Sequence, residues 1–241
     1  MLDPVQESLW FYTAADYLVI NAFLWRDTDA LEECLELVWQ NNLGMIREAE
    51  ELGPEQRFPF PPEDSETLLR CYRRRTPEVL DAEGRRRMLE RAVSDIVTLC
   101  RAMKPVEENA LLYRNLHARC AFAGLAPGDE LPLPGLTSTS RTGQRIDYGC
   151  QDFRTPAQIL EIRLPAGFPA LAGRISENEV LLPPMRYRVL SVETRDQTPL
   201  ITLRPESLLA LRDLLREAAE AARSSLRIPL DDSAWEALLN G

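Results

Sequence analysis

Apolar residues in the first hundred positions recur every three or four residues, which is the spacing of amphipathic helices. Asp3 and Pro4 form a cap and first-turn signal, and Leu52-Gly53-Pro54 is a stop signal. The pattern predicts helices from Leu9 to Trp25, from Asp27 to about Glu51, from about Asp64 onward, and from about Asp81 to Met103. The first 105 residues are therefore expected to be helical.

After Lys104-Pro105 the pattern changes to short apolar runs bounded by Gly and Pro, which is typical of strands. The runs are Ala110 to Leu116, Leu136 to Thr139, Ile159 to Leu164, Val180 to Leu182, Tyr187 to Glu193, and Leu200 to Leu203. A last amphipathic helix is predicted over Glu206 to Leu226. A helix-rich half followed by a strand-rich half favours the α+β class. We expect one domain over residues 1–205, with a helical lobe (1–105) and a strand core (106–205), followed by a helical tail (206–241).

Composition and charge narrow the function classes. The 241 residues carry a formal net charge of -10, and an acidic surface disfavours nucleic acid as a partner. No apolar stretch reaches the roughly 18 residues of a membrane span. The start of the chain has no basic and apolar signal segment, so we expect a cytoplasmic protein, or one delivered into a host or target cell without a classical signal peptide. The single histidine, His117, and five cysteines without Cys-x-x-Cys spacing predict no metal site.

Three short motifs carry the candidate chemistry. Glu177-Asn178-Glu179 places two carboxylates on one side of an extended backbone, just before an apolar strand. Arg114 interrupts an apolar run with a planar, permanently charged fork that suits a diphosphate. Ser138-Thr139-Ser140 supplies short hydroxyls that can orient a carboxylate. Each motif alone is typical of an ordinary solvated surface or turn. Their order and context together distinguish them from Glu48-Ala49-Glu50, which falls on a predicted helix.

This arginine, Ser-Thr-Ser and Glu-x-Glu series resembles the catalytic signature of mono-ADP-ribosyltransferases of the toxin-like class. The resemblance covers about residues 9 to 204, including the helical segment Tyr17 to Arg26. It implies a helical lobe and a split core of two facing, mostly antiparallel sheets with NAD in the cleft between them. It also implies that the protein is a bacterial toxin or effector, which transfers ADP-ribose from NAD to a protein acceptor.

The resemblance also implies a role for each motif residue. Arg114 would contact the NAD phosphates, and Ser138 would hold the catalytic glutamate and line the ribose pocket. Glu179 would bind the ribose 2′-hydroxyl and stabilise the oxocarbenium ion. Glu177 would position the acceptor, and a glutamate at that place implies arginine as the acceptor. Two departures stand out: Asn115 replaces the glycine that usually follows the arginine, and the stacking aromatic is assigned to Tyr148, with Phe153 as the alternative.

Three other interpretations remain open on the sequence. The same cleft could mainly hydrolyse NAD, since water can replace the acceptor. The chain could be a non-catalytic binding module with a vestigial cleft, or an unrelated α+β fold. The loop from Ala166 to Ser176 is the candidate acceptor contact, through an exposed Phe168 or else as a plain packed loop. The identity of the acceptor, the oligomeric state, and whether residues 206–241 bind an inhibitor or a chaperone protein stay undecided.

Overall fold

The structure is a computed structural model that describes residues 3–58, 61–116, 120–142, 156–172, 179–228 and 230. The chain forms two compact units. One consists of Met1–Ala102 with Leu211–Gly241, and the other of Met103–Ala210. The described helices lie in the first unit and the described strands in the second, which confirms the α+β prediction. No described helix is long and apolar enough to cross a membrane.

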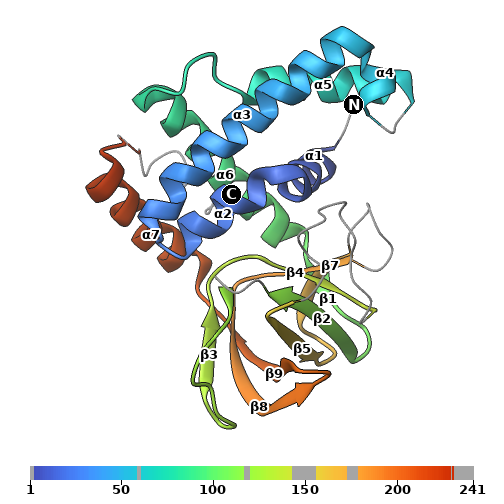
Figure 1. The fold of residues 1–241 in the computed structure, drawn as a ribbon, viewed down its shortest axis with the longest axis vertical. Coiled ribbons are helices and arrows are strands. Elements are labelled where there is room, and N and C mark those ends of the chain that lie inside the picture. The colour runs from blue at the N-terminus through green and yellow to red at the C-terminus, as the bar shows by residue number, and fades with distance from the viewer. Residues whose placement is uncertain are drawn as a thin grey trace. The chain divides into compact units, whose positions relative to one another are not determined.

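The helical unit contains seven α-helices and one π-helical turn among the described residues (Figure 1). They are α1 (Pro4–Phe11), η1 (Tyr12–Asp16), α2 (Tyr17–Leu24), α3 (Thr28–Leu52), α4 (Pro54–Arg57), α5 (Pro62–Arg75), α6 (Ala82–Ala102) and α7 (Leu211–Leu226). The predicted first helix is thus divided by a turn of π-helix, a feature common at functional or strained positions. Helix α7 packs on α2 and α3 of the same unit.

The helix ends follow the capping signals of the sequence. The side chain of Asp3 accepts a hydrogen bond from the backbone of Gln6, and Asp27 caps α3 through the backbone of Ala30. Gly53 ends α3 with φ +93°, a conformation that glycine adopts without strain, and Pro54 starts α4. The predicted stop after Leu52 is therefore confirmed.

The strand unit contains nine described strands (Figure 1). They are β1 (Lys104–Pro105), β2 (Ala110–Leu116), β3 (Glu130–Leu133), β4 (Thr137–Ser140), β5 (Gln158–Leu164), β6 (Pro169–Ala172), β7 (Glu179–Leu182), β8 (Met185–Arg195) and β9 (Thr198–Leu208). Their order in the sheet is β1-β6-β7-β4-β2-β5-β9-β8-β3. Only β5 and β9 are parallel neighbours among these strands. The strands form one continuous hydrogen-bonded sheet.

One apolar core joins strands from both ends of that order. Leu131 and Leu133 of β3 lie in the same buried cluster as Val180 and Leu182 of β7. Strands that are far apart in the hydrogen-bonding order share a core only when the sheet curves back on itself. The two halves of the curved sheet therefore face each other across the core, which accounts for the expectation of two facing sheets.

The sequence prediction was wrong about where the last strand ends. β9 continues through Leu208, and the helix predicted from Glu206 begins at Leu211. Pro205 stands between the predicted strand, Leu200 to Leu203, and the predicted helix, and proline cannot donate a backbone hydrogen bond to a sheet. Pro205 pairs with Tyr187 next to an irregularity in the pairing of β8 with β9, where β9 has the extra residue Glu206, beyond the residues of β9 that pair with β5. A proline is tolerated at such a place.

Candidate active site

Three neighbouring strands bring the three sequence motifs together. Arg114 lies on β2, Ser138 on β4 and Glu179 at the start of β7. β4 lies between the other two strands in the sheet, so its residues can reach both neighbours. All three residues belong to the strand unit.

Ser138 and Glu179 are joined by a short hydrogen bond. The antiparallel register places Ser140 opposite Glu179 and Ser138 opposite Leu181. Because side chains alternate between the two faces of a strand, Ser138 and Glu179 share a face as diagonal neighbours. The Ser138 hydroxyl donates to Oε1 of Glu179 over 2.6 Å. This length is typical of a bond from a hydroxyl to a carboxylate.

Glu179 is a buried carboxyl group with spare hydrogen-bonding capacity. The residue is only 2% exposed. Its second oxygen, Oε2, is buried and has no hydrogen-bond partner among the described residues. A buried polar atom without a partner is costly, and such atoms cluster at sites where a ligand supplies the missing bond. Oε2 is therefore the atom of this cluster best placed to receive a hydroxyl group of a ligand.

Arg114 reaches the backbone of Ser138 from the opposite face of the sheet. Tyr113 pairs with Ser140, so the face that carries Ser138 and Glu179 is that of Tyr113 and not of Arg114. Arg114 lies opposite Leu160 of β5, on the strand face that also carries the buried Leu112 and Leu116. Its Nη1 donates to the backbone carbonyl of Ser138 over 3.1 Å. The guanidinium is only partly buried, and a guanidinium has five N–H donors in a planar fork. The remaining donors suit an anion that presents two oxygens side by side, such as a phosphate.

The rest of the Ser-Thr-Ser motif holds the strands in place. The buried Thr139 donates its hydroxyl to the carbonyl of Val180 on β7 over 2.6 Å, which fixes β4 against the strand that carries Glu179. The hydroxyl of Ser140 lies 3.2 Å from that of Thr142 and accepts from the Thr142 backbone. Of the three hydroxyls, therefore, it is that of Ser138 that meets the carboxylate.

The other predicted site residues fall into two groups. Asn115 is exposed on β2, paired with Ile159, on the strand face opposite to Arg114. Glu177, Tyr148, Phe153 and His117 lie outside the described residues. Phe168 is partly buried against the core of the sheet, as the packed-loop alternative requires.

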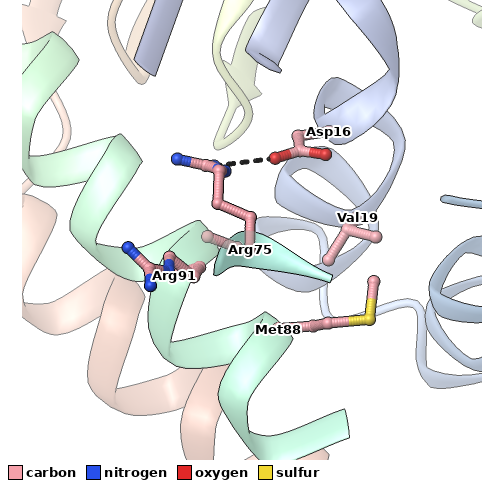
Figure 2. Close-up of a pocket in the computed structure, with 6 residues that line it drawn as sticks. Asp16, Val19, Arg75, Met88 and Arg91 are labelled. Atoms are coloured by element: carbon pink, nitrogen blue, oxygen red, sulfur yellow. Dashed lines mark hydrogen bonds and ion pairs between the residues drawn. The ribbon is translucent and has the colours of Figure 1, made fainter. Parts of the chain in front are cut away.

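A second concentration of charge lies within the helical unit (Figure 2). The Arg75 side chain is 4% exposed and forms ion pairs with Asp95, with Asp16 at 2.9 Å and with Glu7 at 3.3 Å. Its guanidinium also lies 4.0 Å from the centre of the Phe11 ring, a cation–π distance. Sequence reasoning missed this cluster, because the run Arg73-Arg74-Arg75 was typical of a solvated helix end.

The pocket beside this cluster is lined by charged and apolar side chains from η1, α2, α5 and α6. Its lining residues are Asp16, Val19, Arg75, Met88, Arg91 and Ala92. Burial raises the pKa of Asp16 to about 6. The positive charge of Arg75 lowers this pKa, and the negative charge of Asp95 raises it further. Burial also lowers the pKa of Arg91, and Arg75 and Arg74 lower it further. Figure 2 shows Asp16 directed at Arg75 across this pocket. No residue of the three sequence motifs is among the lining residues of this pocket.

The described residues contain no group of three histidine, cysteine, aspartate or glutamate side chains arranged to hold a metal ion. The chemistry available to the strand-unit cluster is that of a carboxylate, a hydroxyl and a guanidinium.

No family model and no curated protein matches the chain. Solved structures that it resembles include bacterial ADP-ribosyltransferase toxins. The catalytic domain of VsdC from Aeromonas hydrophila is 19% identical with a TM-score of 0.47, over 85% of this chain and 100% of that one. Plx2a, an ADP-ribosyltransferase toxin from Paenibacillus larvae, is 14% identical with a TM-score of 0.36, over 57% of this chain and 78% of that one. The Clostridium limosum C3 exoenzyme is 13% identical with a TM-score of 0.35, over 86% and 96%.

Proposed function

We propose that this chain is an NAD-dependent mono-ADP-ribosyltransferase that transfers ADP-ribose to a protein side chain, with arginine as the acceptor. The observation that carries the proposal is the hydrogen bond from Ser138 to a buried Glu179 whose other oxygen has no partner among the described residues. A carboxylate oriented in this way suits a reaction that develops positive charge on a sugar. Arg114, on the far side of the same serine, supplies a cation for the diphosphate of the same substrate.

The proposed reaction breaks the bond between C1′ of the ribose and the nicotinamide nitrogen. Nicotinamide leaves with the bonding electron pair, and positive charge spreads over C1′ and the ring oxygen. Oε2 of Glu179 accepts the hydrogen bond of the 2′-hydroxyl, and the carboxylate charge stabilises the cation. A buried carboxylate does this more strongly than one in water, because the surrounding dielectric constant is lower.

The acceptor nitrogen then attacks C1′ and gives up a proton. A guanidinium has a pKa above about 12, so a base has to act during the attack and not before it. We assign that role to Glu177, two residues before Glu179. We assign the contact with the nicotinamide amide to the backbone of Asn115, and the aromatic contact with nicotinamide to Tyr148.

The proposal extends to the organisation and the setting of the protein. The catalytic domain, proposed as residues 1–205, has to include the end of β9 at Leu208. The proposed tail then begins after Leu208 and contains α7. We propose that the protein acts as a bacterial effector or toxin on a protein of a target cell.

The experiment that tests the proposal is incubation of the purified protein with labelled NAD and agmatine, a small arginine analogue, beside Glu179→Gln. Labelled adduct from the wild type and none from the variant supports an arginine-directed transferase. Nicotinamide release without adduct, dependent on Glu179, points to a glycohydrolase or another acceptor. Absence of both NAD turnover and NAD binding contradicts the proposal.

A further inference from the structure

Tyr113 lies on the same face of the sheet as Ser138 and Glu179. It pairs with Ser140 of β4, and Ser140 pairs on its other side with Glu179 of β7. Directly paired residues of neighbouring strands point to the same face, and Ser138 shares that face because it is two residues from Ser140. Tyr113 and Glu179 are two strand spacings apart, roughly 10 Å between their backbones. The aromatic side chain therefore stands beside the Ser138–Glu179 pair.

Tyr113 is the only aromatic residue on this face of the described strands. Those strands contain one other aromatic residue, Tyr187, which is 0% exposed and belongs to the core on the opposite face. Tyr113 is partly exposed, whereas Leu112, its neighbour on β2, is fully buried in that core. A ligand bound at Glu179 can therefore meet one aromatic side chain of these strands, that of Tyr113.

The ring and the hydroxyl of Tyr113 have no specific partner within the described part of the chain. The hydroxyl makes no hydrogen bond there, and the ring makes no stacking or cation–π contact. Tyr72 of the helical unit differs in both respects. Its ring stacks on that of Phe58 with 5.7 Å between the ring centres, and its hydroxyl accepts a hydrogen bond from Nε1 of Trp10 over 3.3 Å. Tyr72 has the contacts of a structural tyrosine, and Tyr113 does not.

The nicotinamide of NAD has the chemistry that suits such a ring. It is planar, aromatic and positively charged, and the face of a tyrosine attracts it through stacking and the cation–π effect. In the proposed function the backbone of Asn115 contacts the nicotinamide amide. Asn115 is two residues from Tyr113 on the same face of β2, about 7 Å along the strand. A nicotinamide held at Asn115 therefore lies beside the Tyr113 ring.

We propose that Tyr113 is a binding residue for the nicotinamide ring of the NAD substrate. Its ring packs against the face of the charged nicotinamide, on the side of the sheet that carries Glu179. The nicotinamide loses its charge as the bond to the ribose breaks, so the contact stabilises bound NAD at least as much as the transition state. Tyr113 therefore contributes to NAD affinity and not to the rate of the chemical step. The ligand rests on the proposed function, and the inference does not require the assignment of Tyr148.

The first test compares two ligands that differ in the nicotinamide. Carba-NAD carries this ring on a bond that is not cleaved, and ADP-ribose lacks the ring. Calorimetry measures Kd of both for the full chain. We expect Tyr113→Leu to weaken carba-NAD binding about 10-fold, and Tyr113→Phe, which keeps the ring, to stay within about threefold of the wild type. Kd for ADP-ribose should stay within about twofold in both variants.

Leu111→Ala is the matched control for this measurement. Leu111 lies on the same strand and face as Tyr113 and is 43% exposed, so its truncation should change neither Kd. If Tyr113→Leu binds carba-NAD as the wild type does, or loses both ligands equally, the inference is overturned and the proposed function stands. If the wild type binds neither ligand, the proposed function fails and the inference fails with it.

The second test separates binding from chemistry by steady-state nicotinamide release. Tyr113→Leu should raise KM for NAD about 10-fold while kcat falls no more than about twofold, because the contact is already made in bound NAD. A merely structural role would disturb Ser138 and Glu179 on the neighbouring strands, and kcat would fall. A lower kcat with an unchanged KM therefore overturns the inference.

Discussion

The hydroxyl of Ser138 donates to Oε1 of Glu179 over 2.6 Å, although the residue directly opposite Glu179 in the strand pair is Ser140. Two serines of one strand thus flank the same carboxylate, and only the diagonal one meets it. The hydroxyl of Ser140 is engaged with Thr142 instead. Substitution of Ser138 is therefore expected to affect NAD turnover more than substitution of Ser140.

Ser138→Ala should lower kcat/KM for NAD about 10- to 100-fold, because it removes one hydrogen bond to a buried charged group. The measurement is steady-state nicotinamide release at several NAD concentrations. Ser140→Ala is the matched control and should stay within a few-fold of the wild type. Equal losses in the two variants would show that the Ser138–Glu179 bond has no special part in the reaction.

Glu179→Gln should make the folded protein more stable while abolishing turnover. The carboxylate is 2% exposed, and Oε2 has no partner in the described part of the chain, so its charge is buried at a cost. Glutamine keeps the shape and removes that charge, and we expect a gain of about 1–2 kcal/mol in the free energy of unfolding. Denaturant unfolding of both proteins measures the difference. A clear loss of stability would mean that the carboxylate is a structural group.

Arg75→Met should destabilise the helical unit by about 3–5 kcal/mol, since it leaves buried carboxylates without their shared cation. The Arg75 side chain is 4% exposed and bridges Asp95, Asp16 and Glu7. Arg73→Met is the control on the same helix, because Arg73 pairs with Glu50 at 2.8 Å with both side chains about half exposed. That exposed pair should contribute about 0–1 kcal/mol. Similar denaturant midpoints for the two variants would contradict the role of Arg75.

Asp16 should make the stability of the protein depend on pH in weak acid. Its pKa is about 6 in the folded protein against an ordinary value of 3.8, so the folded state holds this proton more tightly. The resulting stabilisation, about 3 kcal/mol for such a shift, is fully present below about pH 4 and is lost as the pH rises to about 6. Asp16→Asn cannot titrate. Its free energy of unfolding, relative to the wild type, should therefore rise between pH 4 and pH 6.

The charges that face Asp16 set the size of this effect. They are Arg75 on α5 and Asp95 on α6, and Arg91 of α6 lines the same pocket. All three are retained in Asp16→Asn, so the difference between the two proteins isolates the Asp16 proton. Unfolding curves at pH 4, 5, 6 and 7 measure it. A difference that does not change with pH would rule out an elevated pKa for Asp16.

The sequence pattern predicted most elements where local signals agree with the tertiary structure. The strand Ala110 to Leu116 has its predicted bounds, because it is a short apolar run of the length typical of strands. α3 begins after the cap residue Asp27 and ends before Gly53, as its capping signals indicate. The strands β1, β3 and β6 were missed, since each is short and contains a proline, which argues against a strand in the sequence.

The sequence predicted which residue types form the candidate site and their order along the chain, but not how their side chains meet. The sequence could propose that Ser138 meets Glu179, but their diagonal contact depends on the register of β4 against β7. The burial of Arg75 likewise depends on helices distant in the sequence.

The most direct test of the central claim is nicotinamide release from NAD by the wild type and Glu179→Gln, measured without any acceptor. The transition-state charge is formed in this step, so the identity of the acceptor does not affect the result. We expect measurable release by the wild type and at least a 100-fold lower rate in the variant. Equal rates in the two proteins, or no release and no NAD binding by the wild type, would contradict a catalytic site built on Arg114, Ser138 and Glu179.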